Sequence, residues 1–557
     1  MAIQNNSEKK HTVRPLSEVI TDLGIRSDEY IPYGWDKAKL RVKALNERLA
    51  DEPQGKLVLV TAINPTPAGE GKTTITIGLG QALHATGHRS LICLREPSLG
   101  PVFGVKGGAT GGGEASITPM ESINLHFTGD IGAITAANNL AAAVLDNHIY
   151  QGNALNIDPT RIFWKRCLDM NDRALRNIVI GLGGRANGVP REDHWQISVA
   201  SEVMAVFCLS KDRQDLRERL ARMVVAFTYD NKPVTTADLK VDGAMAALLV
   251  DAFDPNLVQS LNGSPVLVHG GPFANIAHGS NSIAATRLAL KLGDIVVTEA
   301  GFGADLGAEK FVDITSRAGE FAPQAIVIVA TVRALKYNGG VARADLDIEN
   351  VEAMLDGTVN LVRHIENLRN FAVPVTIAIN RFPSDTEAEL KTLSDVCTAN
   401  GVTSAVVTAF TEGGDGCLEL LNNVLELLDT EEPRSLTPLY DLSLSYRDKL
   451  DKIAKTIYGA GRVDWSKEAL RNLRRFERAG YKNLPICVAK TQYSLSDDPT
   501  MLGAPKDYVF TVRDVQLSAG AGFIVCLAGE IMTMPGLPPK PAAEDIEIDG
   551  EQILGIF

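Results

Sequence analysis

Short apolar runs alternate with amphipathic stretches along most of the chain, and this pattern predicts a β-sheet whose strands are joined by helices. The first run, residues 56–63, is rich in β-branched residues and is typical of a buried strand. A loop containing Gly and Pro follows, then a helical stretch from Thr73 to about Thr86 and a second strand at residues 90–94. A strand, a helix and a strand within about 40 residues form a βαβ unit, so we expect a parallel sheet.

The alternation continues far beyond this unit. Helical periods separate the later runs, which predict strands at residues 266–268, 294–298, 325–329, 375–379 and 404–407 and helices at 349–368 and 385–399. The α/β body is therefore expected to extend to about residue 430.

The two ends of the chain differ from this body. Residues 14–50 are charged with a few Leu anchors, which predicts a largely helical lead-in segment. Pro433 and Pro438 mark a linker, after which a basic helical stretch covers residues 443–480 and strands are predicted at 486–489 and 523–527. We expect these last residues to form a separate C-terminal subdomain.

Composition narrows the class of protein. The chain has 557 residues, of which 45% are hydrophobic and 22% charged, so intrinsic disorder is excluded as its main state. With 55 Lys and Arg against 68 Asp and Glu, the net charge is −13, which argues against non-specific nucleic-acid binding. A local basic cluster could still bind an anionic substrate.

Cellular context follows from three further observations. The first residues contain no apolar signal segment, and no stretch approaches 18 uninterrupted apolar residues. The seven cysteines include no C-x-x-C pair and show no disulfide spacing. These features predict a cytoplasmic protein with no membrane partner, whose cysteines are reduced and mostly buried.

The strongest chemical signal lies between the first predicted strand and helix. There the backbone N–H groups of Gly69, Gly71 and Lys72 are expected to hold phosphate oxygens, with the Lys72 amine on the β- and γ-phosphates and the Thr73 hydroxyl on Mg²⁺. The usual pattern G-x-x-x-x-G-K-[ST] has Gly where Thr66 stands, and the alternative is a plain turn with a capping Thr. The predicted nucleotide-binding residues are Thr66, Pro67, Ala68, Gly69, Glu70, Gly71, Lys72 and Thr73. The expected fold class is therefore α/β, a P-loop-containing parallel-sheet body with additional smaller α/β subdomains.

Arg95 follows the next predicted strand, at the edge of an open α/β sheet where ligands bind. It is placed to hold a phosphoryl or acyl-phosphate group, and the alternative is an ion pair with Glu96 or another carboxylate. The run of glycines at 107–113 is either a mobile lid or a backbone cradle for an anion, with plain flexibility as the alternative.

Other polar and aromatic residues near strand ends are candidates with less specific patterns. His126 and Asp130 are acid–base candidates or structural supports, and His269 and His278 lie nine positions apart without a third ligand, so zinc is not expected. Segments 299–305, 380–383 and 413–416 also follow predicted strands. Within and beside them, Phe382 and Phe410 could stack on an aromatic ligand or simply pack.

Taken together, these segments resemble the formate–tetrahydrofolate ligase family, also called formyltetrahydrofolate synthetase, in its monofunctional form. The run of residues 127–139, FTGDIGAITAANN, is very specific to that family. The matching stretches span almost the whole chain in order and are residues 66–74, 94–101, 119–147, 269–279, 321–340, 519–523 and 535–538.

The resemblance implies a reaction and a set of roles. ATP with Mg²⁺ would activate formate as formyl phosphate, and tetrahydrofolate would take the formyl group to give 10-formyltetrahydrofolate, ADP and phosphate. Lys72 and Arg95 would be catalytic. Phe382, Pro383 and Phe410 match folate-site positions, although many members have Trp where Phe410 stands. The family carries the variant loop with Thr66, is activated by a monovalent cation such as K⁺ or NH₄⁺, and is commonly a homotetramer.

The same resemblance suggests a division of the chain. Residues 1–360 would form a large nucleotide-binding domain with the P-loop, 361–440 a second α/β domain contributing to the folate site, and 441–557 the C-terminal subdomain. Two alternatives stay open at this point. One is a regulatory ATPase switch of the partitioning type, which needs only about 250 residues and would hydrolyse ATP alone. The other is a ligase that uses a different acid.

Overall fold

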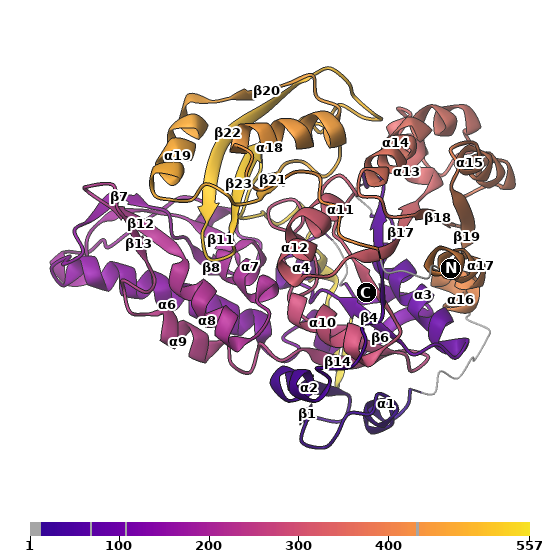
Figure 1. The fold of residues 1–557 in the computed structure, drawn as a ribbon, viewed down its shortest axis with the longest axis horizontal. Helices are drawn as coiled ribbons and strands as arrows, with labels where there is room; N and C mark the ends of the chain where they lie inside the picture. The colour runs from indigo at the N-terminus through magenta and orange to yellow at the C-terminus, as the bar shows by residue number, and fades with distance from the viewer. Residues whose placement is uncertain (1–12, 67–68, 106–108, 430–433, 557) are drawn as a thin grey trace.

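The computed structural model describes residues 13–66, 69–105, 109–429 and 434–556. Within them, one twelve-stranded sheet forms the centre of the molecule, and ten of its strands follow the order β1-β2-β14-β15-β4-β16-β3-β17-β18-β19 (Figure 1). These ten strands are β1 (Tyr30–Tyr33), β2 (Lys37–Leu40), β3 (Lys56–Ala62), β4 (Ser90–Leu94), β14 (Asn256–Ser260), β15 (Pro265–Val268), β16 (Ile295–Glu299), β17 (Pro323–Ala330), β18 (Val375–Asn380) and β19 (Thr403–Val407).

The sheet is parallel from β15 to β19, which confirms the predicted α/β class. β14 pairs antiparallel with β15 and β2, and β2 with β1. Off this path, β6 (Ala115–Thr118) pairs with β14 and with the two-residue strand β5 (Gly111–Gly112). The predicted unit of β3, helix and β4 is present, but β16 lies between its two strands.

Two apolar layers sandwich the sheet because successive side chains of a strand point to opposite faces. In β3, Val58 and Val60 belong to one buried cluster with α3 (Lys72–Ala85) and α17 (Leu418–Leu428). Leu57 and Leu59 belong to the other, with α10 (Ile283–Leu292) and α14 (Val351–Arg369). Burial on both faces explains why the central strands are continuous apolar runs. The helices α13 (Val332–Asn338), α15 (Glu387–Ala399) and α16 (Ala409–Glu412) complete this part of the fold.

The prediction of a largely helical lead-in over residues 14–50 is wrong in part. The segment contains α1 (Leu16–Asp22) and α2 (Val42–Arg48), but β1 and β2 lie between them and extend the main sheet. These strands have only four residues each, so their period is too short to detect against the surrounding charged positions.

A long insertion between β6 and β14 carries a second group of elements. The helices of this group are α5 (Met120–Asn124), α6 (Asp130–Tyr150), α7 (Glu202–Leu209), α8 (Arg213–Arg222) and α9 (Asp242–Leu248). Its three-stranded sheet has the order β13 (Pro233–Thr235), β12 (Val224–Thr228), β7 (Ile157–Ile162). Its two-stranded sheets pair β8 (Arg166–Leu168) with β11 (Trp195–Ile197) and β9 (Ile178–Ile180) with β10 (Arg191–Asp193).

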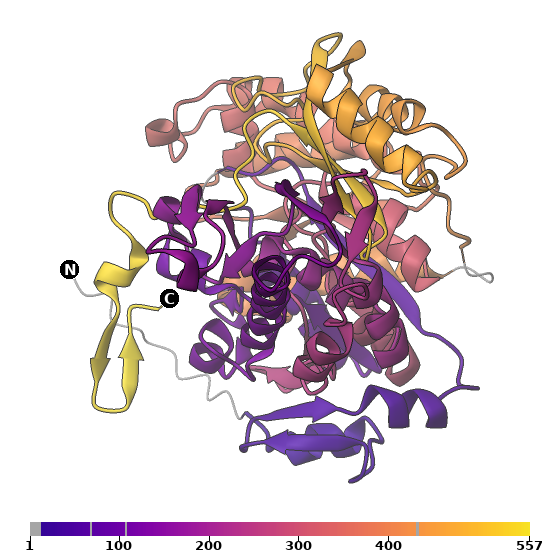
Figure 2. The ribbon, with the colours of Figure 1, turned by 90° about the vertical axis from the view of Figure 1, so that its left-hand side faces the viewer.

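The last part of the chain forms a four-stranded sheet of order β20 (Arg462–Trp465), β22 (Val509–Ser518), β23 (Phe523–Ala528), β21 (Ile486–Ala489). The stretch 443–480, predicted as helical, is divided into α18 (Tyr446–Ile453) and α19 (Lys467–Arg478) with β20 between them. A final hairpin, β24 (Glu547–Asp549) and β25 (Gln552–Leu554), projects from the body (Figure 2).

The division of the chain at residues 360 and 440 stays a prediction. β17 and β18, on either side of residue 360, are neighbours in the main sheet. Among the described helices, none is long and apolar enough to cross a membrane.

Candidate functional site

The strand order brings three predicted segments to one edge of the sheet. β16 lies between β3 and β4, so the carboxyl ends of all three strands are adjacent. The loop that leads to Lys72 follows β3, Arg95 directly follows β4, and Glu299 is the last residue of β16. Open α/β sheets bind ligands at this edge, so these three segments form the candidate site.

The loop before α3 has the backbone of a phosphate-binding turn. Gly71 lies just before the helix with a φ of 74°, which L side chains rarely adopt, and a Cβ there would lie 2.4 Å from the Asn380 amide nitrogen. Lys72 and Thr73 then open the first turn of α3, where free N–H groups and the helix dipole favour an anion. Pro67 and Ala68 lie outside the described residues.

Glu70 fixes this loop to the sheet. Its buried carboxylate accepts hydrogen bonds from the backbone N–H of Thr66, at 2.6 Å, and from the hydroxyl of Thr331 at the end of β17. The amide of Asn380, at the end of β18, donates to the Glu70 carbonyl at 3.0 Å. Burial raises the pKa of Glu70. Its contacts assign Glu70 a structural part in holding the loop.

One buried carboxylate joins the loop to Arg95. Glu299 accepts a hydrogen bond from the Thr73 hydroxyl at 2.8 Å through Oε2 and an ion pair from Arg95 Nη2 at 3.2 Å through Oε1. Arg95 Nη1 also donates to the Pro272 carbonyl at 3.3 Å. Arg95 therefore pairs with a carboxylate, as the alternative allowed, but with Glu299 and not with Glu96.

The pairing leaves Arg95 with donors for a ligand. Its Nε is buried and no described atom accepts from it, and about a fifth of the side chain is exposed. A guanidinium has five N–H donors, so two protein contacts do not saturate it. The geometry is that of an arginine held by a carboxylate, with donors left over that an anion could accept.

Thr73 and Glu299 are also suited to Mg²⁺. P-loop nucleotide enzymes hold that ion with the loop Ser or Thr hydroxyl and an acidic residue from a neighbouring strand. The hydroxyl of Thr73 and the carboxylate of Glu299 are already within hydrogen-bond distance of each other, at the end of the strand next to β3. The oxygen donors present at this point therefore fit the ion.

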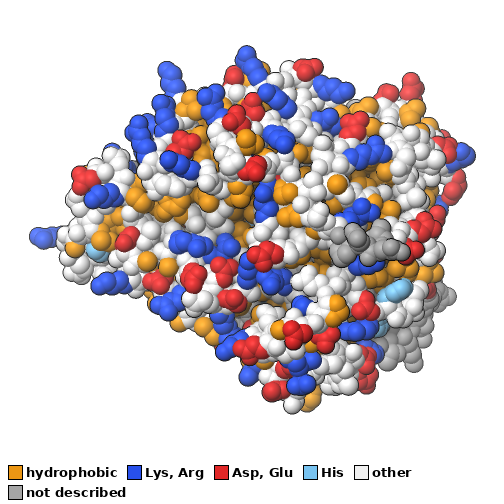
Figure 3. All heavy atoms as spheres, in the orientation of Figure 1, with side chains coloured by type: hydrophobic (Ala, Val, Ile, Leu, Met, Phe, Trp, Pro, Cys, Tyr) orange, Lys and Arg blue, Asp and Glu red, His pale blue; other side chains and the backbone are white. Residues whose placement is uncertain are grey.

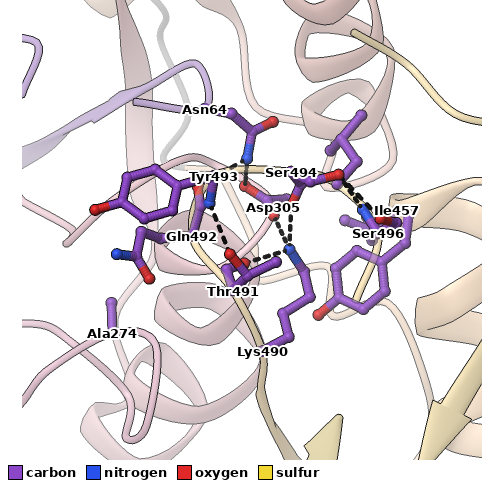
Figure 4. Close-up of polar contacts among 12 residues, drawn as sticks. Asn64, Ala274, Asp305, Ile457, Lys490, Thr491, Gln492, Tyr493, Ser494 and Ser496 are labelled. Atoms are coloured by element: carbon purple, nitrogen blue, oxygen red, sulfur yellow. Dashed lines mark hydrogen bonds and ion pairs between the residues drawn. The ribbon is translucent and has the colours of Figure 1, made fainter. Parts of the chain in front are cut away.

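The segment that leads from β3 into the loop is held by a buried polar network (Figure 4). The amide of Asn64 donates to Asp305 Oδ1 at 3.2 Å, and Asp305 Oδ2 forms an ion pair of 2.7 Å with Lys490. Lys490 also donates to the carbonyls of Thr491 and Ser494 and is fully buried, like Asp305. Lys490, which directly follows β21, thus supports the residues just before the candidate nucleotide loop.

The candidate folate residues lie beyond the same edge. Phe382 and Pro383 follow β18, and Phe410 lies in α16, directly after the neighbouring strand β19. The Arg333 guanidinium lies over the Phe382 ring, 5.0 Å from its centroid. Phe410 is 60% exposed. An aromatic ring with that exposure is available to stack on a planar ligand.

The predicted glycine-rich lid includes residues 107 and 108, which lie outside the described residues. The end of this segment packs against Phe410, one of the candidate folate residues. The N–H of Glu114 donates a hydrogen bond to the Phe410 carbonyl at 2.9 Å, and a Cβ at Gly113 would lie 1.9 Å from that carbonyl oxygen. Close approach to α16 therefore explains Gly113. A lid movement stays a prediction.

Two of the remaining histidine and aspartate candidates, Asp130 and His269, have structural partners in the core. Asp130 accepts hydrogen bonds from Lys39 Nζ at 2.8 Å and from Asn256 Nδ2 at 2.7 Å, all within the core. His269 bonds to the Ser282 hydroxyl and the Ala252 carbonyl, and burial lowers its pKa to about 3. In the described part of the chain, no group of three or more His, Cys, Asp or Glu side chains could hold a metal ion. All seven cysteines are buried and unpaired, as the sequence predicts.

Sequence reasoning did not assign two important groups. Glu299 was visible as the polar residue that ends an apolar run, but its partners come from loops more than 200 positions earlier in the chain. Lys490 follows a short apolar strand in the same way, and its buried ion pair with Asp305 had no signal in the sequence.

Comparison with known protein families gives one match over essentially the whole length. The family model described as formate–tetrahydrofolate ligase matches residues 3–557.

Proposed function

The chain belongs to the formate–tetrahydrofolate ligase family and is a ligase of that type, and from this premise we propose that ATP drives its reaction through formyl phosphate. The observation that supports the proposal is the shared carboxylate of Glu299, which links the nucleotide loop at Thr73 to Arg95. A site that activates a carboxylic acid with ATP needs a phosphate-binding loop and an anion-binding group side by side.

The proposed reaction has two steps. A formate oxygen attacks the γ-phosphorus of ATP, the bond from that phosphorus to the β–γ bridging oxygen breaks, and ADP leaves. N10 of tetrahydrofolate then attacks the formyl carbon, the carbon–oxygen bond to phosphate breaks, and N10 loses its proton. Formate needs this activation because its carboxylate would otherwise have to expel oxide.

The residues of the site divide the work between binding and charge stabilisation. Lys72 and the N–H groups at the start of α3 would hold the β- and γ-phosphates and stabilise the charge that shifts during transfer. Arg95, oriented by Glu299, would hold formate and then the phosphate of the intermediate. Thr73 and Glu299 would hold Mg²⁺, which neutralises phosphate charge when bound.

Replacing Arg95 with alanine is expected to lower kcat by about 10²- to 10³-fold, the range seen when one stabilising donor is removed. ATP affinity should change little, because Arg95 lies at the end of β4, outside the nucleotide loop. Initial rates and calorimetric titration with a non-hydrolysable ATP analogue separate the two quantities. A loss confined to ATP binding would place Arg95 on the nucleotide instead.

Phe382, Pro383 and Phe410 would bind the pterin and its aromatic neighbour. Replacing Phe410 with alanine should raise KM for tetrahydrofolate about 2- to 10-fold with kcat nearly unchanged, because a stacking contact of 0.5–1.5 kcal/mol is lost equally from substrate and transition state. Phe410→Trp enlarges the stacking face and should lower that KM. If both variants keep the KM of the parent enzyme, Phe410 does not contact the folate.

Activation by a monovalent cation stays a proposal, and Glu96 offers a place for the ion. Its side chain is buried beside Arg95 in the chain, and no described atom bonds to its Oε2. Burial and repulsion from Asp130 raise the pKa of Glu96 well above its usual value. A bound K⁺ or NH₄⁺ would supply the missing partner. The homotetramer and the cytoplasmic location likewise stay predictions.

Formation of 10-formyltetrahydrofolate tests the proposed function. The product is read by absorbance after acid conversion to the methenyl form, with ATP, formate and tetrahydrofolate omitted in turn and with and without K⁺. We expect product only when all three substrates are present, and more of it with K⁺. ATP hydrolysis without product would favour the regulatory switch, and product with another acid in place of formate would change the substrate.

A further inference from the structure

A large cavity lies apart from the candidate site, between the C-terminal subdomain and the inserted region. It has a volume of about 410 Å³ and is bounded by β7, β12 and the start of α7 on one side and by α19, β22 and β23 on the other. None of the site residues Lys72, Arg95, Glu299, Phe382 or Phe410 lines it. Cavities of this size suit small organic ligands.

The surface at this position is partly apolar. In Figure 3, hydrophobic atoms gather in the band between the surface over α19 and the surface over β7 and β12. Two of the lining aromatic residues, Phe163 and Phe227, meet edge to face with centroids 5.5 Å apart. This wall offers a planar ligand an apolar contact.

Four basic residues also line the cavity, and two of them are matched by acids. Arg161 pairs with Asp158 at 3.1 Å and Arg471 with Glu468 at 2.9 Å. Lys165 and Arg475 are different: among the described residues, neither has a carboxylate within ion-pair distance or a side-chain hydrogen bond. Arg475 lies over the aromatic wall, 5.5 Å from the Phe227 centroid and 5.9 Å from the Phe163 centroid.

The acids that line the cavity are Glu202, Glu468 and Asp514, and none of the three forms an ion pair with Lys165 or Arg475. Asp514 accepts hydrogen bonds from the Asn472 amide at 2.8 Å and the Val515 N–H at 2.7 Å. Glu202 accepts a hydrogen bond from the Gly520 N–H, and burial raises its pKa to about 8. Burial lowers the pKa of Lys165, and the charge of Asp514 opposes that shift only in part. An anion would therefore stabilise the cationic form of Lys165.

We propose that this cavity binds a small aromatic anion, whose carboxylate or phosphate group lies against Lys165 and Arg475 and whose ring packs on Phe163 and Phe227. The proposal does not depend on the ligase reaction, because the cavity shares no residue with that site. In this binding site, the unpaired positive charges of Lys165 and Arg475 lie beside the aromatic rings of Phe163 and Phe227.

Pyridoxal 5′-phosphate is a suitable probe because it is an aromatic anion whose aldehyde condenses with a lysine amine and releases water. Borohydride then reduces the imine, and peptide mass spectrometry locates the label. Saturating Mg²⁺-ATP protects Lys72 during labelling. We expect Lys165 to be labelled at least about tenfold faster than the exposed Lys467, and pyridoxal without the phosphate to label it about tenfold more slowly.

Variants on α19 provide the matched controls. Arg475→Gln should slow labelling of Lys165 about tenfold, while Arg478→Gln, at an exposed position of the same helix that does not line the cavity, should leave it unchanged. Arg475→Lys keeps the charge and should retain most of the labelling. Should the glutamine variant fail to fold, this second variant still tests the role of the charge. Labelling of Lys165 at the rate of Lys467, or equally by pyridoxal and its phosphate, would overturn the proposal.

Discussion

Replacing Lys72 with alanine is expected to reduce ATP-dependent formation of 10-formyltetrahydrofolate by at least about 10³-fold, which brings it close to the detection limit. The reason is the position of Lys72 at the first residue of α3, directly after Gly71 with its positive φ. In the proposed reaction its ammonium group would meet the phosphates between which the bond breaks, and positive charge at that point would stabilise the transition state most.

The fold should tolerate this change. Alanine has the highest helix propensity, and the first residue of a helix loses no backbone hydrogen bond on substitution. We expect the free energy of unfolding of Lys72→Ala to lie within about 1 kcal/mol of the parent value. Thermal unfolding and circular dichroism measure this alongside the activity.

A matched control is available on another helix. Lys467 is the first residue of α19 and is exposed, so Lys467→Ala makes the same chemical change at the same helical position far from the loop. Its activity should equal that of the parent enzyme. Near-normal turnover in Lys72→Ala would remove the assignment of the nucleotide loop.

Replacing Lys490 with methionine is expected to destabilise the protein by about 3–5 kcal/mol, because it leaves the carboxylate of Asp305 buried without its counter-ion. Both side chains are fully buried and 2.7 Å apart, and Lys490 has two further acceptors in the carbonyls of Thr491 and Ser494. Methionine keeps most of the length and volume of lysine, so the loss reflects charge more than packing.

Replacing Lys490 should also alter the candidate site. Asp305 holds Asn64, which lies two residues before Thr66, so an unpaired Asp305 would reorganise the backbone that enters the nucleotide loop. We expect ATP affinity to fall together with stability, as measured by calorimetric titration and urea unfolding. If stability falls and ATP affinity does not, the network supports the fold without positioning the loop.

A double variant separates the charge from other effects. Asp305→Asn removes the acid at nearly constant shape, so Lys490→Met combined with Asp305→Asn should recover much of the stability lost in Lys490→Met alone. Simple addition of the two single effects would show that the ion pair is not what Lys490 contributes.

Local signals were enough to predict the elements of the candidate site that are close together in the chain. The strand at 56–62, the loop and α3 follow one another within 30 residues, and each has its own composition. The rule that ligands bind at the carboxyl ends of parallel strands also placed Arg95 correctly at the edge, before any strand order was known.

The rest depended on strand order, which short-range patterns do not contain. β16 follows β4 by about 200 residues in the chain but lies between β3 and β4 in the sheet. This position brings Glu299 to Thr73 and Arg95. β1 and β2 were missed because each has only four residues. Lys490 was not singled out, because its buried partner Asp305 lies 185 positions earlier in the chain.

The insertion of β16 between β3 and β4 has a consequence for synthesis on the ribosome. The residues of the nucleotide loop are made early, but both sheet neighbours of β3, which are β16 and β17, are made after residue 290. At about 5–20 residues per second, roughly 10–50 s pass between the emergence of β4 and that of β17. Until β15 and β16 emerge within that interval, β3 and β4 are two apolar strands without any of their neighbours in the sheet. The nascent chain should therefore need protection from aggregation, and it should gain nucleotide binding only after β17 has left the exit tunnel.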